Sequence, residues 1–335
     1  MNKKPDISLG CGGRDCASCR QGDRTDERVR IFSFTSKNDL PTLLDALKAE
    51  DELNGTVVVI PAHVRVEEPL SLPACAVPDG TVVVVLEEGS SLTLLDTVRC
   101  GCGTGPQGQR LVVAVGEGAE LRLAELRCLA PGQSFVGEVR ADVAAAGRLE
   151  LFSALLGGGR VDSRNEISLS GLGARVERIG LSFASGDGRL EVHDTVRHFS
   201  DRTSSYIMTR GVLAGTAAAN RQLLTEIGST TVGCDGRQDC RELPLTPEAR
   251  AEIRPSLEIG AEDVTCSHGA SVSPPDRTAV FYLTARGLDP AVARQQLALG
   301  FFRPALERLW DEPTRAAVRQ MILSRLDCRT ETEIN

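Results

Sequence analysis

The sequence predicts a mainly β protein built as a β-solenoid, with a short helix before it and a pair of helices after it. The chain has 33 glycines among 335 residues and few aromatic residues, a composition typical of short strands joined by tight turns. A small residue followed by an alternating apolar and charged run also recurs, as in residues 118–123 and 146–151. The first apolar residues of such runs are Leu92, Leu121, Leu149, Val176 and Leu190.

These anchor residues are separated by 29, 28, 27 and 14 positions. Steps near a common unit of 14, with glycines at the corners, are typical of the turns of a parallel β-helix. An antiparallel sandwich has similar turn spacing, so periodicity alone leaves that alternative open.

The elements are expected in the following order. Residues 1–30 are polar and read as a flexible tail that carries Cys11, Cys16 and Cys19. Residues 31–54 are expected to be a helical segment, because Leu40, Leu43, Leu44 and Leu47 recur at helical spacing, with Asn38 or Asp39 as the cap. Residues 55–287 are the β-helix core, in which the valine-rich runs 57–60 and 82–86 are expected to be buried strands.

Residues 288–328 form the predicted helical pair. The first helix begins at Asp289 and Pro290 and places Ala293, Leu297 and Phe301 on one stripe; the second follows Pro313. Such a pair can cap the end of a solenoid, which otherwise exposes a sheet edge, or present an apolar groove to a partner. The residues alone favour the cap.

Composition and missing motifs exclude several functions. The net charge of −8, from 46 acidic and 38 basic residues, argues against nucleic acid or an anionic membrane as main partner. We find neither a long apolar run nor an apolar N-terminal stretch, so no membrane span is expected and a cytoplasmic location is predicted. The sequence lacks a P-loop, a nucleophile elbow and an H-E-x-x-H motif, so neither direct ATP binding nor catalysis is expected.

Four residues are the main metal-ligand candidates. Cys266 and His268 lie two positions apart in an alternating run, so a strand would place both on one face. Thiol and imidazole together suit iron, copper or zinc. Cys234 and Cys240, six positions apart, would also share a face, although the Asp-Gly pair after Cys234 equally suits a bulged loop. The alternative is that any of these cysteines is a small buried apolar residue.

Two secondary candidates are less specific. Cys11, Cys16 and Cys19 reproduce three positions of the plant-type C-x4-C-x2-C cluster spacing, but no fourth cysteine follows nearby. Cluster binding and a reactive tail both remain open for them. His198 stands alone, and such a residue is more often a hydrogen-bonded structural histidine than a ligand.

The run from Arg254 through Ala270, followed by residues 281–287, resembles the C-terminal core of the SufB/SufD family of iron–sulfur cluster assembly scaffold proteins. The stretch from His198 to Val212 is similar to the family's H-x-x-x-x-T-S-S…K-G segment, and residues 243–246 match the stretch before its P-x-L-E-I motif. The resemblance covers about a third of the chain, from residue 186 to residue 300.

This resemblance implies a right-handed parallel β-helix that pairs with a second SufB/SufD-type subunit, as a homodimer or a heterodimer. It implies a non-catalytic accessory subunit, with a transient iron–sulfur cluster or iron at the subunit interface. It also implies that the C-terminal helices dock a SufC-type ATPase rather than form a cap. The residues it assigns to docking are Arg286, Gly287, Leu297, Phe301 and Phe302.

By the same resemblance, Cys266 and His268 fall on the SufD-like metal motif, and Cys240 or Cys234 approximates the cluster-holding cysteine of SufB. The chain has Gly269 after His268 where SufB carries glutamate, and it lacks the family's long helical N-terminal domain. The rival class is a β-solenoid structural or glycan-binding protein without metal chemistry. A solenoid lyase has no carboxylate or lysine constellation to support it.

Overall fold

The structure is a computed structural model that describes residues 28–34, 55–73, 80–98 and 107–327. The predicted N-terminal helical stripe of Leu40 to Leu47, and Cys11, Cys16 and Cys19, lie outside these residues. Residues 30–34, at the start of the segment expected to be helical, form the strand β1.

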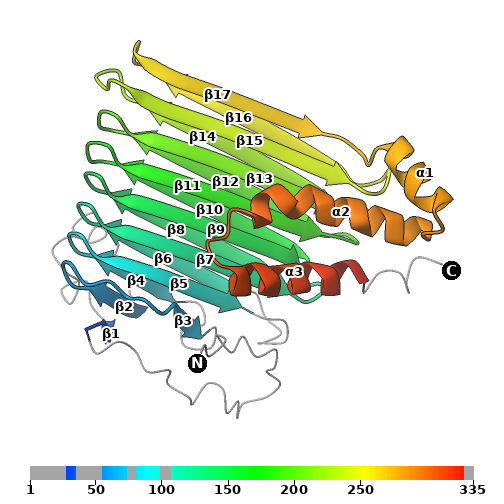
Figure 1. Cartoon of the computed structure of the whole chain (residues 1–335), viewed down its shortest axis with the longest axis horizontal. Coiled ribbons are helices and arrows are strands. Elements are labelled where there is room, and N and C mark those ends of the chain that lie inside the picture. Colours follow the sequence, from blue (N-terminus) through cyan, green and yellow to red (C-terminus); the bar gives the residue numbers. More distant parts are fainter. Residues whose placement is uncertain (1–27, 35–54, 74–79, 99–106, 328–335) are drawn as a thin grey trace.

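Two stacked β-sheets wind along one axis (Figure 1). One sheet contains, in spatial order, β1 (Arg30–Phe34), β2 (Gly55–Ile60), β4 (Thr81–Leu86), β6 (Gln107–Val115), β8 (Phe135–Val143), β10 (Arg160–Leu169), β12 (Arg189–His198), β14 (Ala218–Ile227) and β16 (Arg250–Ile259). The other contains β3 (Leu70–Pro73), β5 (Ser91–Val98), β7 (Glu120–Leu129), β9 (Arg148–Gly157), β11 (Arg175–Ala184), β13 (Ser204–Leu213), β15 (Cys234–Pro244) and β17 (Val264–Val272). We call them the β16 sheet and the β17 sheet.

Successive strands of each sheet pair in parallel, apart from β1 with β2. The predicted anchors Leu92, Leu121, Leu149 and Val176 lie directly opposite one another on β5, β7, β9 and β11. Leu190 lies on β12 in the other sheet, so the step of 14 residues is half a turn. The predicted parallel β-solenoid is therefore confirmed, and the antiparallel sandwich is excluded.

One corner of the solenoid is held by a ladder of residues with left-handed backbone conformation. Each donates its N–H to a carbonyl of the next turn at 2.7 to 2.9 Å. The ladder residues are His63, Gly89, Gly118, Ala146, Gly173, Arg202 and Gly233. Because left-handed backbone is unfavourable for any residue with a Cβ atom, glycine recurs at this corner.

Replacing Ala146 by glycine is expected to stabilise the protein by about 0.5–1 kcal/mol, because Ala146 is exposed and held at φ 52°. The matched control is Gly118→Ala, which introduces a Cβ at φ 61° where the surroundings are open, and should destabilise. Urea unfolding of both variants measures the effect. Equal midpoints for Ala146→Gly and wild type would contradict the argument that this corner is strained.

Three helices follow the strands: α1 (Arg277–Ala285), α2 (Pro290–Leu306) and α3 (Glu312–Asp327). The predicted C-terminal pair is confirmed as α2 and α3. The helix α1 was not predicted and occupies residues that the sequence analysis placed within the core segment. No helix in the described part of the chain is long and apolar enough to cross a membrane.

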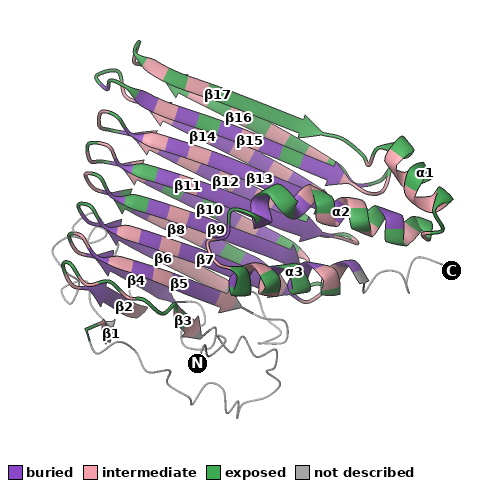
Figure 2. Ribbon diagram, viewed as in Figure 1, coloured by how far each residue is buried: buried purple, intermediate pink, exposed green. Residues whose placement is uncertain are grey.

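The helices α2 and α3 lie flat on the outer face of the β17 sheet, against β9, β11 and β13, and do not cover the end of the solenoid (Figure 1). The contact is apolar and includes Phe152, Phe183 and Phe302, all buried. The last strands, β16 and β17, are largely exposed (Figure 2). The helical pair is therefore not an end cap, and within the part of the chain that the structure describes, the solenoid is open at β16 and β17.

Candidate functional site

Cys266 and His268 lie on β17, the edge strand at the open end of the solenoid. In register, Cys266 is opposite Gly236 of β15 and His268 is opposite Gln238. Gly236 and Gln238 are buried residues that face the interior, and in-register parallel pairing keeps neighbours on the same face. The prediction that Cys266 and His268 share one face is therefore confirmed, and that face continues the interior of the solenoid.

Both side chains can be reached from solvent: Cys266 is half-buried and His268 is exposed. Desolvation raises the pKa of the Cys266 thiol, and a hydrogen bond with the backbone of Gly236 partly opposes this. The thiol therefore carries its proton at neutral pH, and a metal would have to displace that proton to bind.

Cys234 and Cys240 lie on β15 and point into the interior, so they share a face as predicted, and the bulged-loop alternative is excluded. Both are fully buried. Cys240 accepts a hydrogen bond of 2.6 Å from Thr209 Oγ1, and burial raises the pKa of its thiol to about 11. Cys234 is 3.3 Å from Thr203 Oγ1. Both residues are thus packed in the interior, and Cys240 keeps its proton at neutral pH.

The pairing of β15 with β17 places Cys234 and Cys240 at different distances from Cys266. Cys234 is opposite Val264, two residues from Cys266, whereas Cys240 is opposite Ala270. Four residues of strand separate Ala270 from Cys266, a distance of about 13 Å along the strand. Cys240 is therefore not brought beside Cys266, and of the two thiols Cys234 is the nearer.

His198 is a buried structural residue. Its Nδ1 lies 2.8 Å from Thr203 Oγ1 and its Nε2 lies 2.8 Å from Ser205 Oγ. Burial lowers the pKa of His198 to about 4, so the ring is neutral at physiological pH. Because both ring nitrogens have hydrogen-bond partners, His198 does not serve as a metal ligand in this conformation. The structural alternative given by the sequence is the correct one.

The interior contains buried ion pairs that sequence reasoning missed. Arg178 lies 3.0 Å from Asp194 and donates a hydrogen bond of 2.8 Å to Ser153. In the same row Asn165 donates to Asp194 at 2.8 Å. The available signal was a charged residue at an inward position of the alternating run in β11, where a neighbour such as Val176 is apolar.

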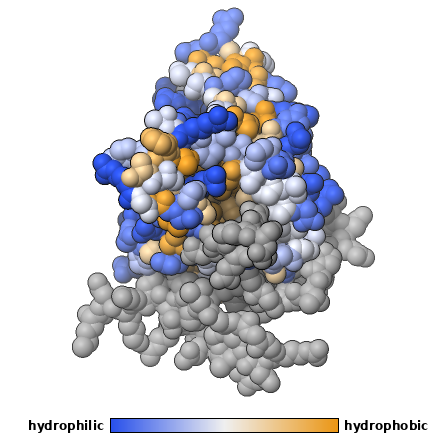
Figure 3. Space-filling view, turned by 90° about the vertical axis from the view of Figure 1, so that its right-hand side faces the viewer, coloured by the Kyte–Doolittle hydropathy of each residue, from blue (hydrophilic) through white to orange (hydrophobic). Residues whose placement is uncertain are grey.

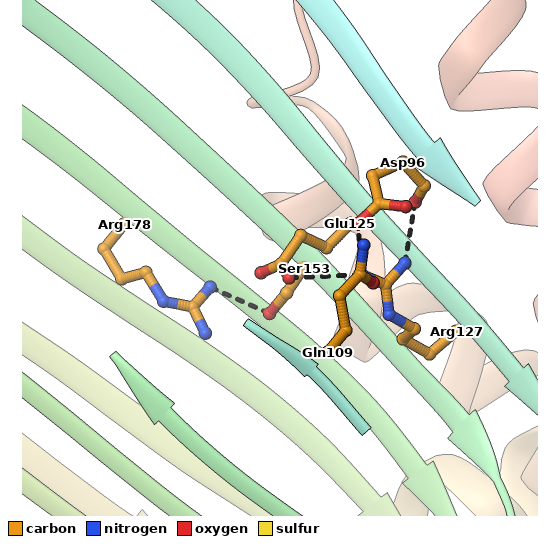
Figure 4. A network of polar contacts seen from close by, with 6 residues as sticks. All are labelled: Asp96, Gln109, Glu125, Arg127, Ser153 and Arg178. Carbon is orange, nitrogen blue, oxygen red and sulfur yellow. Dashed lines mark hydrogen bonds and ion pairs between the residues drawn. The ribbon is translucent and has the colours of Figure 1, made fainter. Parts of the chain in front are cut away.

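A second buried group surrounds Arg127, nearer the N-terminal end (Figure 4). Arg127 pairs with Asp96, donates 2.7 Å to Gln109 and lies 3.4 Å from Glu125. Burial raises the pKa of Glu125, which favours a protonated carboxyl where two acidic groups share one arginine. These groups hold the strands in register and lie away from the open end.

The exposed apolar residues near the C-terminus lie on α1. This helix buries none of its residues; Phe281 is 72% exposed and Tyr282 is 53% exposed, with Arg286 stacked 4.4 Å above the Tyr282 ring. Viewed from the side of the molecule on which α1 lies, the surface shows hydrophobic residues interspersed among hydrophilic ones (Figure 3).

The predicted docking residues are therefore divided. Arg286 and Gly287 are exposed, Leu297 and Phe301 are half-buried, and Phe302 is completely buried between α2 and the sheet. The assignment of Phe302 to docking was wrong, because its ring has no surface to offer a partner.

Within the described residues, no group of three or more His, Cys, Asp or Glu side chains is arranged to hold a metal ion. The chain by itself thus offers a pair of soft ligands on an open strand edge. Fold and site together define a parallel β-solenoid with candidate metal ligands on its last turn and helices packed on one sheet.

Comparison with known proteins identifies the family. Residues 76–301 match the model described as SUF system FeS cluster assembly, SufBD core domain. The chain belongs to this family, as the resemblance predicted. It is 24% identical to the iron-sulfur cluster assembly protein SufD of Bacillus subtilis over 83% of this chain and 65% of that protein. The chain therefore spans somewhat less than two thirds of the length of this relative.

Two further relatives support the same family. An iron-sulfur cluster assembly SufBD family protein of Mycobacterium tuberculosis is 25% identical over 88% of this chain and 77% of its own length. The protein SufD of Escherichia coli is 26% identical over 53% of this chain and 41% of its own length. The family supports a subunit of a SUF-type iron–sulfur cluster assembly system and does not favour a glycan-binding solenoid.

Proposed function

We propose that this chain is an accessory scaffold subunit that holds iron, or a nascent cluster, between its open end and a second subunit. The observation that carries this proposal is the placement of Cys266 and His268 on a strand edge that has no neighbouring strand on its outer side among the described residues. Iron–sulfur clusters and tetrahedral metal sites take four protein ligands. Two side chains at an open edge are half of such a set, so a partner supplies the rest.

The neighbouring residues agree with an accessory role. Gly269 follows His268, so the chain lacks the carboxylate that SufB carries there, and Cys240 is a buried thiol about 13 Å along the strand from Cys266. The metal is cargo in this proposal, and the chain acts by positioning a thiol and an imidazole without catalysing a reaction itself.

We further propose that the SufC-type ATPase of the system docks on α1 and the adjoining half-buried side of α2. Phe281 and Tyr282 are the most exposed large apolar residues of the helices, and they stand on a helix that buries no residue of its own. In this arrangement ATP is bound by the partner, since the chain has no P-loop.

Anaerobic reconstitution with iron and sulfide tests the site. The double variant Cys266→Ala/His268→Ala is expected to lose most of the iron and visible absorbance that wild type retains after desalting. The matched control is Thr265→Ala/Ser267→Ala, which changes two outward residues of the same strand. Iron retention that is equal in wild type and in the Cys266/His268 variant would remove the site from the proposal.

A further inference from the structure

We infer that Gln238 of β15 is a positioning residue for His268, and that its side-chain oxygen accepts a hydrogen bond from the ring nitrogen that does not bind the metal. This inference rests on the proposed function and deepens it, because it names the residue that orients the imidazole. A histidine that binds a metal almost always donates its other ring N–H to an oxygen acceptor, which fixes the tautomer and the direction of the ring. The proposed site therefore needs an acceptor close to His268.

The side chain of Gln238 crosses the interior of the solenoid, and its amide is held in one orientation. Its Nε2 donates to Thr225 Oγ1 at 2.9 Å and to the carbonyl oxygen of Ser256 at 3.1 Å. Both acceptors lie on strands of the opposite sheet, β14 and β16. Because a carbonyl oxygen can only accept, the NH2 group and not the oxygen of Gln238 must face Ser256. The two contacts use both hydrogens of the NH2 group.

The side-chain oxygen of Gln238 is left with no donor. Gln238 is only 3% exposed, and its Oε1 is buried without a hydrogen-bond partner among the described residues. A buried carbonyl oxygen without a donor costs free energy, so such atoms are uncommon in folded proteins. This oxygen is therefore an acceptor in place for a donor that another state of the protein brings to it.

The register shows which residue can supply that donor. Gln238 is opposite Ile207 of β13 on one side and opposite His268 of β17 on the other. Ile207 is apolar and fully buried, so of these two neighbours only His268 has a side-chain N–H to give. Neighbouring strands are about 4.8 Å apart, and residues in parallel register share a face. His268 is exposed, so its ring turns over Gln238 by a side-chain rotation alone.

The next inward residue of β15 supports the same arrangement around the thiol. Gly236 is opposite Cys266, and the Cys266 thiol has a hydrogen bond with the Gly236 backbone. A Cβ atom at Gly236 would lie 3.1 Å from Thr225 Cγ2 and 3.5 Å from Cys266 Sγ, so glycine keeps the space beside the sulfur open. The strand β15 thus offers a backbone group to the thiol and an amide oxygen to the imidazole, which fits a metal held by Cys266 and His268.

Two substitutions of Gln238 separate positioning from packing. Gln238→Met and Gln238→Glu both remove Nε2 and its bonds to Thr225 and Ser256, so a purely structural role makes the two variants alike. Only the Glu variant keeps an oxygen that can accept from His268. In Co²⁺ titrations of the full chain, followed by the cobalt–thiolate absorption, Gln238→Met is expected to lower the affinity by about tenfold or more, and Gln238→Glu by less than about threefold. The matched control is Gln222→Met on the outer face of β14, which should leave Co²⁺ affinity unchanged.

Nitrogen-15 NMR of the histidine rings in the Zn²⁺-loaded wild-type chain gives a second readout that needs no folded variant of Gln238. With the His268 signals assigned by their loss in His268→Ala, one ring nitrogen is expected to bind zinc and the other to carry a hydrogen protected from exchange with water. Free exchange of that hydrogen, equal Co²⁺ affinities of the Met and Glu variants, or a wild-type chain that binds neither metal would overturn the inference.

The double variant Cys266→Ala/His268→Ala distinguishes this failure from failure of the proposed function. If it loses Co²⁺ binding while the Met and Glu variants of Gln238 bind equally well, only the role of Gln238 is contradicted. If it binds Co²⁺ as wild type does, the proposed site is contradicted together with its positioning residue.

Discussion

Arg178→Met is expected to lower the free energy of unfolding by about 3–5 kcal/mol, one of the two largest effects that we predict for a single substitution. Arg178 and Asp194 are 1% and 2% exposed, on strands of opposite sheets, and lie 3.0 Å apart. Without the guanidinium, Asp194 keeps the hydrogen bond from the Asn165 amide but loses its ion-pair partner at 3.0 Å, so its buried charge is poorly compensated. Urea unfolding followed by circular dichroism measures the loss.

The control is Arg164, an exposed arginine that precedes Asn165 on β10. Arg164 of β10 lies 3.4 Å from Asp162 with its side chain 65% exposed. Arg164→Met is expected to change stability by less than about 0.5 kcal/mol, because solvent screens exposed pairs. If Arg178→Met proves as mild as Arg164→Met, water reaches the interior and the ion pair does not hold the two sheets together.

Much of the fold could be predicted from the sequence because the solenoid repeats its constraints in every turn. The apolar residues Leu92, Leu121 and Leu149 must stack on one another, and that stacking fixes their spacing. The interior pairs could not be predicted, since Arg178 and Asp194 are 16 residues apart and meet only after both sheets are in register. The helix α1 was missed because the local pattern of residues 277–285 is weak and the helix buries none of them.

The sequence predicted the part of the candidate site that lies on β17, but not its relation to β15. Alternation along residues 264–272 is enough to place Cys266 and His268 on one face. The relation to Cys234 and Cys240 depends on the register of β15 against β17, which the sequence does not show. That register places Val264, not Cys266, opposite Cys234. The burial of both thiols likewise follows from their place one turn inside the open end.

Phe302→Ala is expected to produce the other large loss, about 3–5 kcal/mol, because Phe302 is fully buried where α2 meets the sheet. The cavity would lie in an apolar cluster that includes Phe152 and Phe183. Thermal unfolding measures the loss, and proteolysis of the native protein is expected to begin at α2 and α3 as they come loose.

Phe281→Ala is the matched variant, since the same residue type is removed from a site that is 72% exposed. Its stability should change by less than about 0.5 kcal/mol. If α1 docks the ATPase, Phe281→Ala should nevertheless weaken binding of a SufC-type ATPase in calorimetry by about tenfold or more, because exposed aromatic residues at interfaces contribute most of the binding energy. The two variants therefore distinguish a residue that packs the helices against the sheet from a residue that contacts a partner. Unchanged ATPase affinity in a folded Phe281→Ala protein would remove α1 as the docking element.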